Sequence, residues 1–298
     1  MKDKKKSLKV KKAVEGYLFA SPWIIGFFIF TAGPMIASLL LSFCKYDVLT
    51  TLEWVGVGNY KQMFNTDLFW KALYNTLYWV ILGVPLRQAM ALLLALLTNQ
   101  KIKGKPLFRT IFYVPSVVSG VALAMLWVWL FEPSIGLINT MLRTLGIKNP
   151  PLWLGSEEWA KPALIIMSLW GVGQGMVIYL AGLQDIPIQL YEAAEIDGAG
   201  VWHKFWKITI PLLTPSIFFN LIMGIIGSFQ VFTQAYVMTR GGPAYSTYFY
   251  VLYIYDEGFQ YMHMGYASAL AWILFLIILF FTLLQLRSSR RWVVYERL

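Results

Sequence analysis

Apolar residues gather in six long stretches that short polar segments separate. The stretches are 17–44, 76–97, 110–131, 162–184, 212–238 and 265–286. A helix that spans a bilayer needs about 20 predominantly apolar residues, and each stretch reaches that length. Five of them contain no Asp, Glu, Lys or Arg, and the second contains only Arg87. The pattern predicts an all-α membrane protein with six transmembrane helices and no large soluble domain.

The first stretch follows a Lys-rich start, as a secretory signal peptide does. It is longer than the apolar core of about 7–15 residues in such a signal, and no small-residue cleavage site follows it. We therefore expect a retained helix.

Composition agrees with a membrane protein. Hydrophobic residues make up 58% of the chain and charged residues 13%, whereas a soluble domain has roughly 45–50% and about 25%. These values also exclude a disordered chain. The one cysteine, Cys44, excludes a disulfide framework and a Cys-rich metal site.

The distribution of basic residues predicts the orientation. Of the 25 Lys and Arg residues, 17 fall in the tails and loops on one side of the predicted helices and 7 on the other. Because cytoplasmic loops carry the excess of Lys and Arg, both termini are expected in the cytoplasm. Residues 1–16 and 287–298 are then cytoplasmic tails, and 17–286 form the membrane domain. The Lys-rich tail is interpreted as an orientation signal and not as a nucleic-acid site.

Polar residues lie inside two of the predicted spans. The fourth carries Gly171, Gln174 and further glycines, and the fifth carries Phe229, Gln230, Thr233 and Gln234. In one continuous helix Gln230, Thr233 and Gln234 would share a face. Their amide and hydroxyl groups donate and accept hydrogen bonds, which suits a polyhydroxyl solute, and Phe229 could stack on a sugar. Interhelical hydrogen bonds and close helix packing at the glycines are the alternative.

No catalytic or nucleotide-binding constellation is visible. The two histidines are far apart in sequence, and neither a G-x-S-x-G elbow nor a phosphate-binding loop occurs. We therefore expect no enzyme activity, no cofactor and no metal site, and ATP would have to bind another chain. No carboxylate or histidine falls in a predicted span, which disfavours a proton-driven carrier. Arg87 could snorkel, pair with a lipid headgroup or face a partner.

Residues 187–211 predict a helix–turn–helix on the cytoplasmic side. Pro187 suits the first turn of a helix, and Asp197 with Gly198 forms a turn signal that ends it. A second short helix, at about 201–208, would precede a new element at Pro211.

This segment resembles the EAA motif of ABC-importer permeases, the inner-membrane components of binding-protein-dependent transport. The resemblance rests on Glu192-Ala193-Ala194, Gly198 after three residues, and 208–211, where Ile210 replaces the usual Leu. Similar segments include 54–60, 75–77, 108–115, 180–184 and 241–243, so the likeness spans nearly the whole chain. It is nearest to the carbohydrate-uptake branch in its six-helix form.

The resemblance implies a type I ABC importer permease in a bacterial or archaeal cell membrane. A second homologous permease, two cytoplasmic ATP-binding subunits and an extracytoplasmic solute-binding protein would be its partners, besides membrane lipid. The EAA loop would dock into the ATPase. The residues implied in this coupling are Tyr191, Glu192, Ala193, Ala194, Asp197, Gly198, Ala199 and Pro211.

The expected substrate is a sugar, with an oligosaccharide first and a sugar phosphate or polyamine as alternatives. It would meet Gly171, Gln174, Phe229, Gln230, Thr233 and Gln234. An ion-coupled carrier and a membrane enzyme are the competing classes. The aromatic run 245–255 and Trp153 and Trp159 are interpreted as an interfacial belt, with contact to the binding protein as the alternative.

Overall fold

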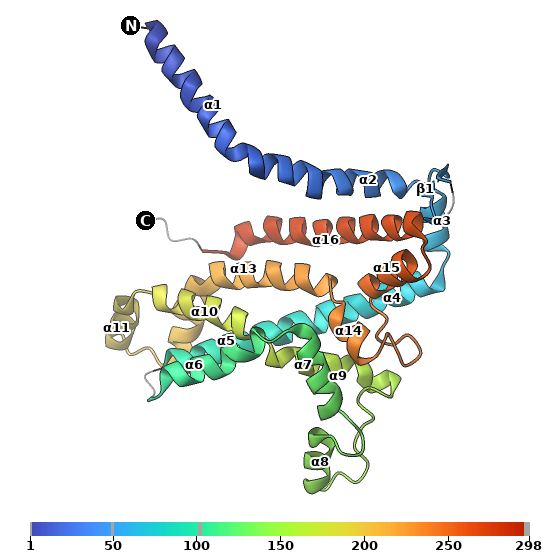
Figure 1. Ribbon diagram of the computed structural model, residues 1–298. Coiled ribbons are helices and arrows are strands. Elements are labelled where there is room, and N and C mark those ends of the chain that lie inside the picture. The colour runs from blue at the N-terminus through green and yellow to red at the C-terminus, as the bar shows by residue number, and fades with distance from the viewer. Residues whose placement is uncertain (1, 49–50, 101–102, 295–298) are drawn as a thin grey trace. The chain divides into compact units, whose positions relative to one another are not determined.

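The computed structural model of the chain describes residues 2–48, 51–100 and 103–294, without the side chains of residues 2–10 and 13 (Figure 1). Two compact units divide it. Unit 1 comprises residues 1–65 and 256–272, and unit 2 comprises residues 66–255 and 273–298. Lys101 and Arg297, which the charge count places in the cytoplasm, lie outside the described residues.

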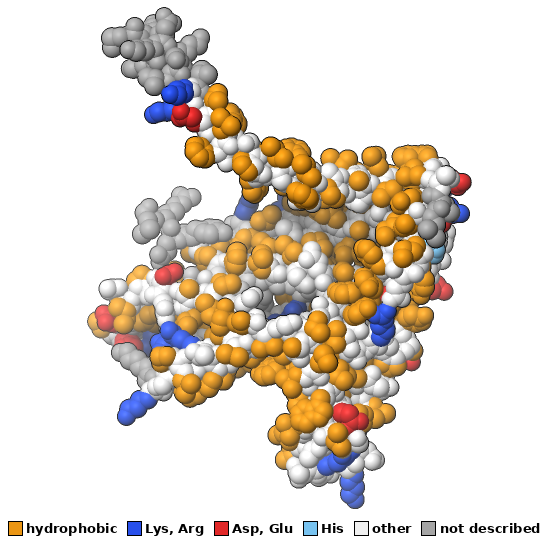
Figure 2. Space-filling model, in the orientation of Figure 1, with side chains coloured by type: hydrophobic (Ala, Val, Ile, Leu, Met, Phe, Trp, Pro, Cys, Tyr) orange, Lys and Arg blue, Asp and Glu red, His pale blue; other side chains and the backbone are white. Residues whose placement is uncertain are grey.

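Unit 1 begins with one long helical run. It consists of α1 (Lys2–Phe27), the π-helical turn η1 (Phe28–Ala32) and α2 (Gly33–Leu41). The predicted tail is thus helical from Lys2 and continuous with the first span, Val14–Leu41. None of the most apolar part of that span is buried, and orange side chains cover its visible face (Figure 2). Such a surface suits contact with lipid or with another helix.

The rest of unit 1 is held by hydrogen bonds around residues 42–60. Strands β1 (Cys44–Lys45) and β2 (Glu53–Trp54) pair antiparallel and are followed by α3 (Gly58–Phe64). Cys44 thus lies in a strand and not in the first span, which corrects the predicted boundary. Buried Asn59 donates to the carbonyls of Ser42 and Cys44, at 2.9 Å each. The segment 54–60, identified as similar to the permease family, therefore closes the loop after the first span.

The last helix, α16 (Met264–Trp292), follows the π-helical turn η5 (Asp256–Gln260) and extends past the predicted end at Leu286. Within unit 1, the N–H of Gly265 donates to Tyr46 O at 3.1 Å, and the backbone of Cys44 leaves no room for a Cβ at this glycine.

Unit 2 contains the second to fifth spans. The second span consists of α4 (Asp67–Tyr78), η2 (Trp79–Gly83) and α5 (Val84–Asn99). The third follows as α6 (Lys105–Tyr113), η3 (Val114–Ser116) and α7 (Gly120–Leu130), and after α8 (Leu137–Thr144) the fourth as α9 (Glu157–Trp170) and α10 (Gly173–Asp185). The rest of the unit contains α11 (Ile188–Ile196), α12 (Val201–Lys204), η4 (Phe205–Thr209), α13 (Ile210–Phe229), α14 (Thr233–Met238) and α15 (Tyr250–Tyr255).

Three of the six predicted spans are not single helices. The third breaks between Ser116 and Gly120 with a bend of 95°, and the fourth bends by 48° between Trp170 and Gly173. The fifth ends at Phe229, and α14 is a separate short helix. Within the described residues, four helices are long and apolar enough to span a membrane, and each bent pair taken as one span gives six. The predicted all-α six-span class is confirmed, while the prediction of unbroken spans is wrong.

Helices α5, α10 and α13 form the core of unit 2. Ala91 and Ala95 of α5 meet Met176 and Tyr179 of α10, and Leu213 joins from α13. A Cβ on Gly175 would lie 3.2 Å from the Cβ of Ala91, so α10 approaches α5 through small residues. In a membrane, such close packing substitutes for the hydrophobic driving force that lipid removes.

The predicted aromatic belt is mostly wrong. Tyr248, Phe249, Tyr250 and Tyr253 are at most 5% exposed, whereas an interfacial belt faces lipid headgroups. They are buried because the loop before α15 folds onto α4, where Asn75 Nδ2 donates to Tyr245 O at 2.7 Å and to Tyr248 O at 3.2 Å.

Trp153 is also buried, and its Nε1–H donates to Asn139 Oδ1 at 2.7 Å. Trp159, in contrast, is 40% exposed. Trp153 therefore serves the internal packing of the segment between α7 and α9.

Candidate functional site

Two cavities lie among the spans of unit 2 and share Arg87. The first, here called the Gln88 cavity, has a volume of about 280 Å³ and is lined from α5, α10 and α13. The second, the Gln230 cavity, has a volume of about 210 Å³ and lies at the end of α13 and the start of α14. Arg87 therefore stands at the boundary of both.

A hydrogen-bond network fixes the wall of the Gln88 cavity. Gln88 Nε2 donates to Asn220 O at 2.8 Å, and Tyr179 O–H donates to Gln88 Oε1 at 2.8 Å. Asn220 Nδ2 donates to Gly175 O at 3.3 Å. These bonds join α5, α10 and α13, so the three helices position the cavity wall together. A Cβ on Gly224 would come within 2.8 Å of Gln88 Nε2, which explains a glycine where the amide needs space.

Arg87 is held by backbone, hydroxyl and ring contacts. Its Nε donates to Gly83 O at 3.1 Å, and Nη2 donates to Ser228 Oγ. Its guanidinium carbon lies 5.3 Å from the centre of the Trp79 ring. Arg87 therefore contacts other residues of its own chain, whereas the sequence left open whether it snorkels, pairs with a lipid headgroup or faces a partner.

The predicted substrate residues fall into three groups. Gly171 and Gln174 line the Gln88 cavity. Gln230, Thr233 and Gln234 line the Gln230 cavity, although the shared helix face predicted for them is wrong because α13 ends at Phe229. A turn and the start of α14 bring the three side chains to one cavity instead.

Phe229 stands apart from the other predicted residues. Its side chain is fully buried and packs against Phe281, with ring centres 5.4 Å apart. The expectation that it stacks on a sugar does not fit this arrangement, because no face of the ring is open.

Sequence reasoning left Arg87, Gln88 and Asn220 out of the candidate site. A signal existed for each, because a charged or amide side chain inside an apolar span requires a partner or water. What the sequence lacked was the pairing between spans, which depends on how α5 and α13 are rotated.

The second candidate site is the elbow, residues 187–211, which Figure 1 shows at the end of α10 and α13. Helix α11 ends in a Schellman motif: Ala199 N–H donates to Ala194 O at 2.8 Å, and Gly198 N–H donates to Glu195 O at 3.0 Å. Gly198 adopts φ of +78°, the left-handed conformation that this motif requires. The predicted helix end at Asp197 and Gly198 is confirmed.

The second half of the elbow differs from the prediction. Helix α12, the π-helical η4 and α13 follow one another without a break over Val201–Phe229. Pro211 lies in the first turn of α13, close to the predicted start of an element, but no turn separates that element from the helix before it. Proline is tolerated there because the π-helical turn before it loosens the regular backbone pattern.

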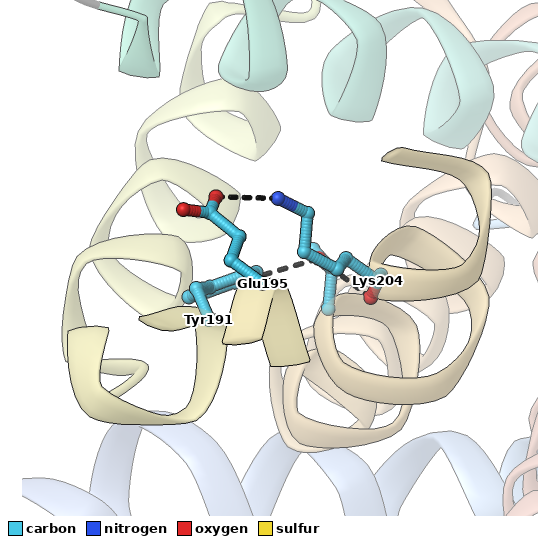
Figure 3. Close-up of polar contacts among 4 residues, drawn as sticks. Tyr191, Glu195 and Lys204 are labelled. Carbon is cyan, nitrogen blue, oxygen red and sulfur yellow. Dashed lines mark hydrogen bonds and ion pairs between the residues drawn. The ribbon is translucent and has the colours of Figure 1, made fainter. Parts of the chain in front are cut away.

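Side chains brace the two arms of the elbow (Figure 3). The ammonium of Lys204 lies 2.6 Å from a carboxylate oxygen of Glu195, and the hydroxyls of Tyr191 and Thr209 are 2.9 Å apart. The hydrogen bond from Lys204 and its positive charge hold the pKa of Glu195 below its usual range. Tyr191 is thus a bracing residue within the elbow.

The outer surface of the elbow is apolar with acidic residues beside it. Ile196 is 87% exposed and Trp202 75%, and Trp206 is also exposed. The side chains of Glu192 and Asp197 are exposed as well. A cluster of large apolar side chains on a surface that faces water is typical of a protein-binding site.

Known proteins resemble the chain over its length. The family of binding-protein-dependent transport system inner membrane components matches residues 88–294. The probable ABC transporter permease protein YesP of Bacillus subtilis is 45% identical, over 98% of this chain and 96% of that protein. The lactose transport system permease protein LacF of Rhizobium radiobacter is 38% identical, over 95% and 97%.

A solved structure gives the same fold. One chain of a bacterial ABC transporter involved in the import of the acidic polysaccharide alginate matches with a TM-score of 0.85 and 28% identity, over 96% of this chain and 99% of that one. The fold, the elbow and these matches agree, and the chain belongs to the family of inner-membrane components of binding-protein-dependent transport systems.

Proposed function

We propose that the chain is one permease subunit of an ATP-driven importer and forms part of the path of a sugar, with an oligosaccharide as the first choice. Of the similar proteins, one is a lactose transport system permease and another belongs to a transporter involved in the import of the polysaccharide alginate. The observation that carries the proposal is the pair of cavities among the spans, whose walls include the amide groups of Gln88, Gln174, Gln230 and Gln234. An amide both donates and accepts, as the hydroxyls of a sugar require.

The elbow is the proposed site of energy coupling. Its exposed apolar side chains and Glu192 suit a groove on a cytoplasmic ATP-binding subunit, into which a short helix fits as a knob. Two such subunits would act on this chain and on a second, homologous permease. The exposed face of Val14–Leu41 offers surface for that second permease or for lipid.

The extracytoplasmic partner is a solute-binding protein, because the family consists of inner-membrane components of binding-protein-dependent transport systems. It would deliver the sugar to the segments 45–72, 132–161 and 239–264. In this proposal both termini and the elbow would face the cytoplasm of a bacterial or archaeal cell, which the excess of Lys and Arg on that side supports.

The test is affinity purification of the full-length chain from membranes of its host, followed by uptake measurements in cells that lack its gene. We expect a second permease and an ATP-binding protein to co-purify, and uptake of labelled oligosaccharide to depend on the gene. Uptake by the purified chain alone in liposomes, driven by an ion gradient, would refute the proposal. Preferred uptake of a polyamine would refute the sugar assignment. The cavities argue against a polyamine cation, because no carboxylate is among their described lining residues.

A further inference from the structure

Arg87 is a charge inside the membrane domain without a matching opposite charge among the described residues that line the two cavities. Among the described residues that line the Gln88 and Gln230 cavities, Arg87 alone is charged. Neither the ion pair of Lys204 with Glu195 nor that of His263 with Glu257 includes it. An ionisable side chain in a span is costly unless it pairs, and it is therefore retained mainly for a function.

The contacts of Arg87 leave donors free. A guanidinium has five N–H groups in a rigid fork. One bonds to Gly83 O and one to Ser228 Oγ, so three have no partner among the described residues. Both acceptors are neutral, and the Trp79 ring lies on one face of the guanidinium. These contacts hold the fork in place without neutralising it.

The position of the fork fits a solute that passes between the two cavities. Arg87 lines both of them, whereas the amides divide: Gln88 and Gln174 line one, and Gln230 and Gln234 the other. A sugar chain held by amides on either side would therefore bring each unit past the same positive charge.

We propose that Arg87 selects acidic sugars, by forming a charge-assisted hydrogen bond to a carboxylate on the cargo as it passes between the two cavities. This inference rests on the proposed function and names the substrate class of the same site. The planar fork matches a carboxylate in a bidentate pair. A carboxylate balances the single charge of Arg87, whereas a phosphate monoester carries about −1.5 to −2 and would leave negative charge uncompensated.

The test measures uptake in the host lacking its own copy of the gene, with the whole importer present. The probes are labelled trisaccharides of glucuronate, galacturonate and mannuronate, the carboxyl-reduced neutral counterpart of each, and glucose 6-phosphate. Wild type is compared with Arg87→Met, which removes the charge at similar length, and Arg87→Lys, which keeps it. Arg290→Met, an exposed position near the end of α16, is the matched control. Chain abundance in the membrane and co-purification of the ATP-binding subunit are measured for every variant.

We expect wild type to prefer at least one uronate trisaccharide over its neutral counterpart. Arg87→Met should lower the ratio of acidic to neutral uptake about tenfold or more, the loss expected for one charge-assisted hydrogen bond. Arg87→Lys should restore part of the ratio, and Arg290→Met should leave it unchanged.

Three results would overturn the inference. Preference for neutral trisaccharides in wild type, or an unchanged ratio in a normally abundant Arg87→Met chain, would show that Arg87 only joins α5 to α13. Preference for glucose 6-phosphate would assign the charge to phosphate. In the first two cases sugar import itself stands, whereas uptake of no sugar at all by wild type would refute the proposed function.

Discussion

The turn at Gly198 offers a test in which backbone conformation is separated from contact. Its φ is +78°, and a Cβ built there meets nothing within 4 Å. A side chain at this position therefore costs conformational energy without a steric clash. Left-handed backbone costs an L-residue about 1–2 kcal/mol, with β-branched residues at the upper end, and Asn tolerates it better. Val and Asn are similar in size, so Gly198→Val and Gly198→Asn differ mainly in this cost.

We expect Gly198→Val to lower ATP-driven uptake about 5–30-fold, the factor that one to two kcal/mol represents. The reason is that the Schellman bonds of Ala199 and Gly198 no longer form in the preferred backbone of valine, so the elbow loses the angle between its arms. Gly198→Asn should retain most of the uptake. The assay is binding-protein-stimulated ATP hydrolysis and sugar uptake by the importer in proteoliposomes, normalised to the amount of chain inserted. Equal uptake by the two variants would refute the conformational reasoning.

Three further predictions concern the elbow, the cavities and an outer loop. Glu192→Lys should abolish uptake and co-purification of the ATP-binding subunit while membrane insertion remains; normal uptake would contradict the coupling role. Gln230→Ala should lower uptake with ATPase binding intact, and unchanged uptake in this variant, in Gln174→Ala and in the double variant would exclude both amides. Hydrogen bonds from Ile135 N–H and Ser134 hold the pKa of Glu132 below its usual value. The carboxylate of Glu132 therefore stabilises this loop at pH values above the ordinary pKa of a carboxyl group, and the stabilisation is lost as the pH falls through the lowered pKa of Glu132. Limited proteolysis of segment 132–161 should accelerate in that acid range and lose this pH step in Glu132→Gln.

Hydropathy predicted the number and position of the spans because burial in lipid depends on composition over about 20 residues. It could not reveal where those spans break. Gly171 sits at the 48° bend between α9 and α10, yet the window that contains it is strongly hydrophobic on average and holds no charged residue. The same holds at Phe229, where the helix ends although Val231 and Phe232 continue the apolar run. The hydropathy of a window depends only on its composition and therefore gives no information on where the helix bends or ends.

The elbow was more predictable than the cavities. Its helix end depends on local backbone chemistry at Asp197 and Gly198, which the sequence displays directly. The cavity wall depends on Gln88 reaching Asn220, residues 132 positions apart that meet only because two helices pack at a given rotation. The buried tyrosines of 248–253 are a second example, because a run of aromatic residues has the same sequence pattern at a lipid interface as in a loop that packs on the protein.

The unbroken helix Val201–Phe229 has a mechanical consequence. Its 29 residues extend about 43 Å at 1.5 Å per residue. Exposed Trp206 in the elbow and Ser228 beside Arg87 belong to the same helix. A tilt of about 5° at the first end displaces the other by about 4 Å, more than the length of a hydrogen bond. If the elbow docks on an ATP-binding subunit as proposed, a tilt of this helix would move Ser228 and Arg87 at the two cavities together with Trp206, without relay through a series of side chains.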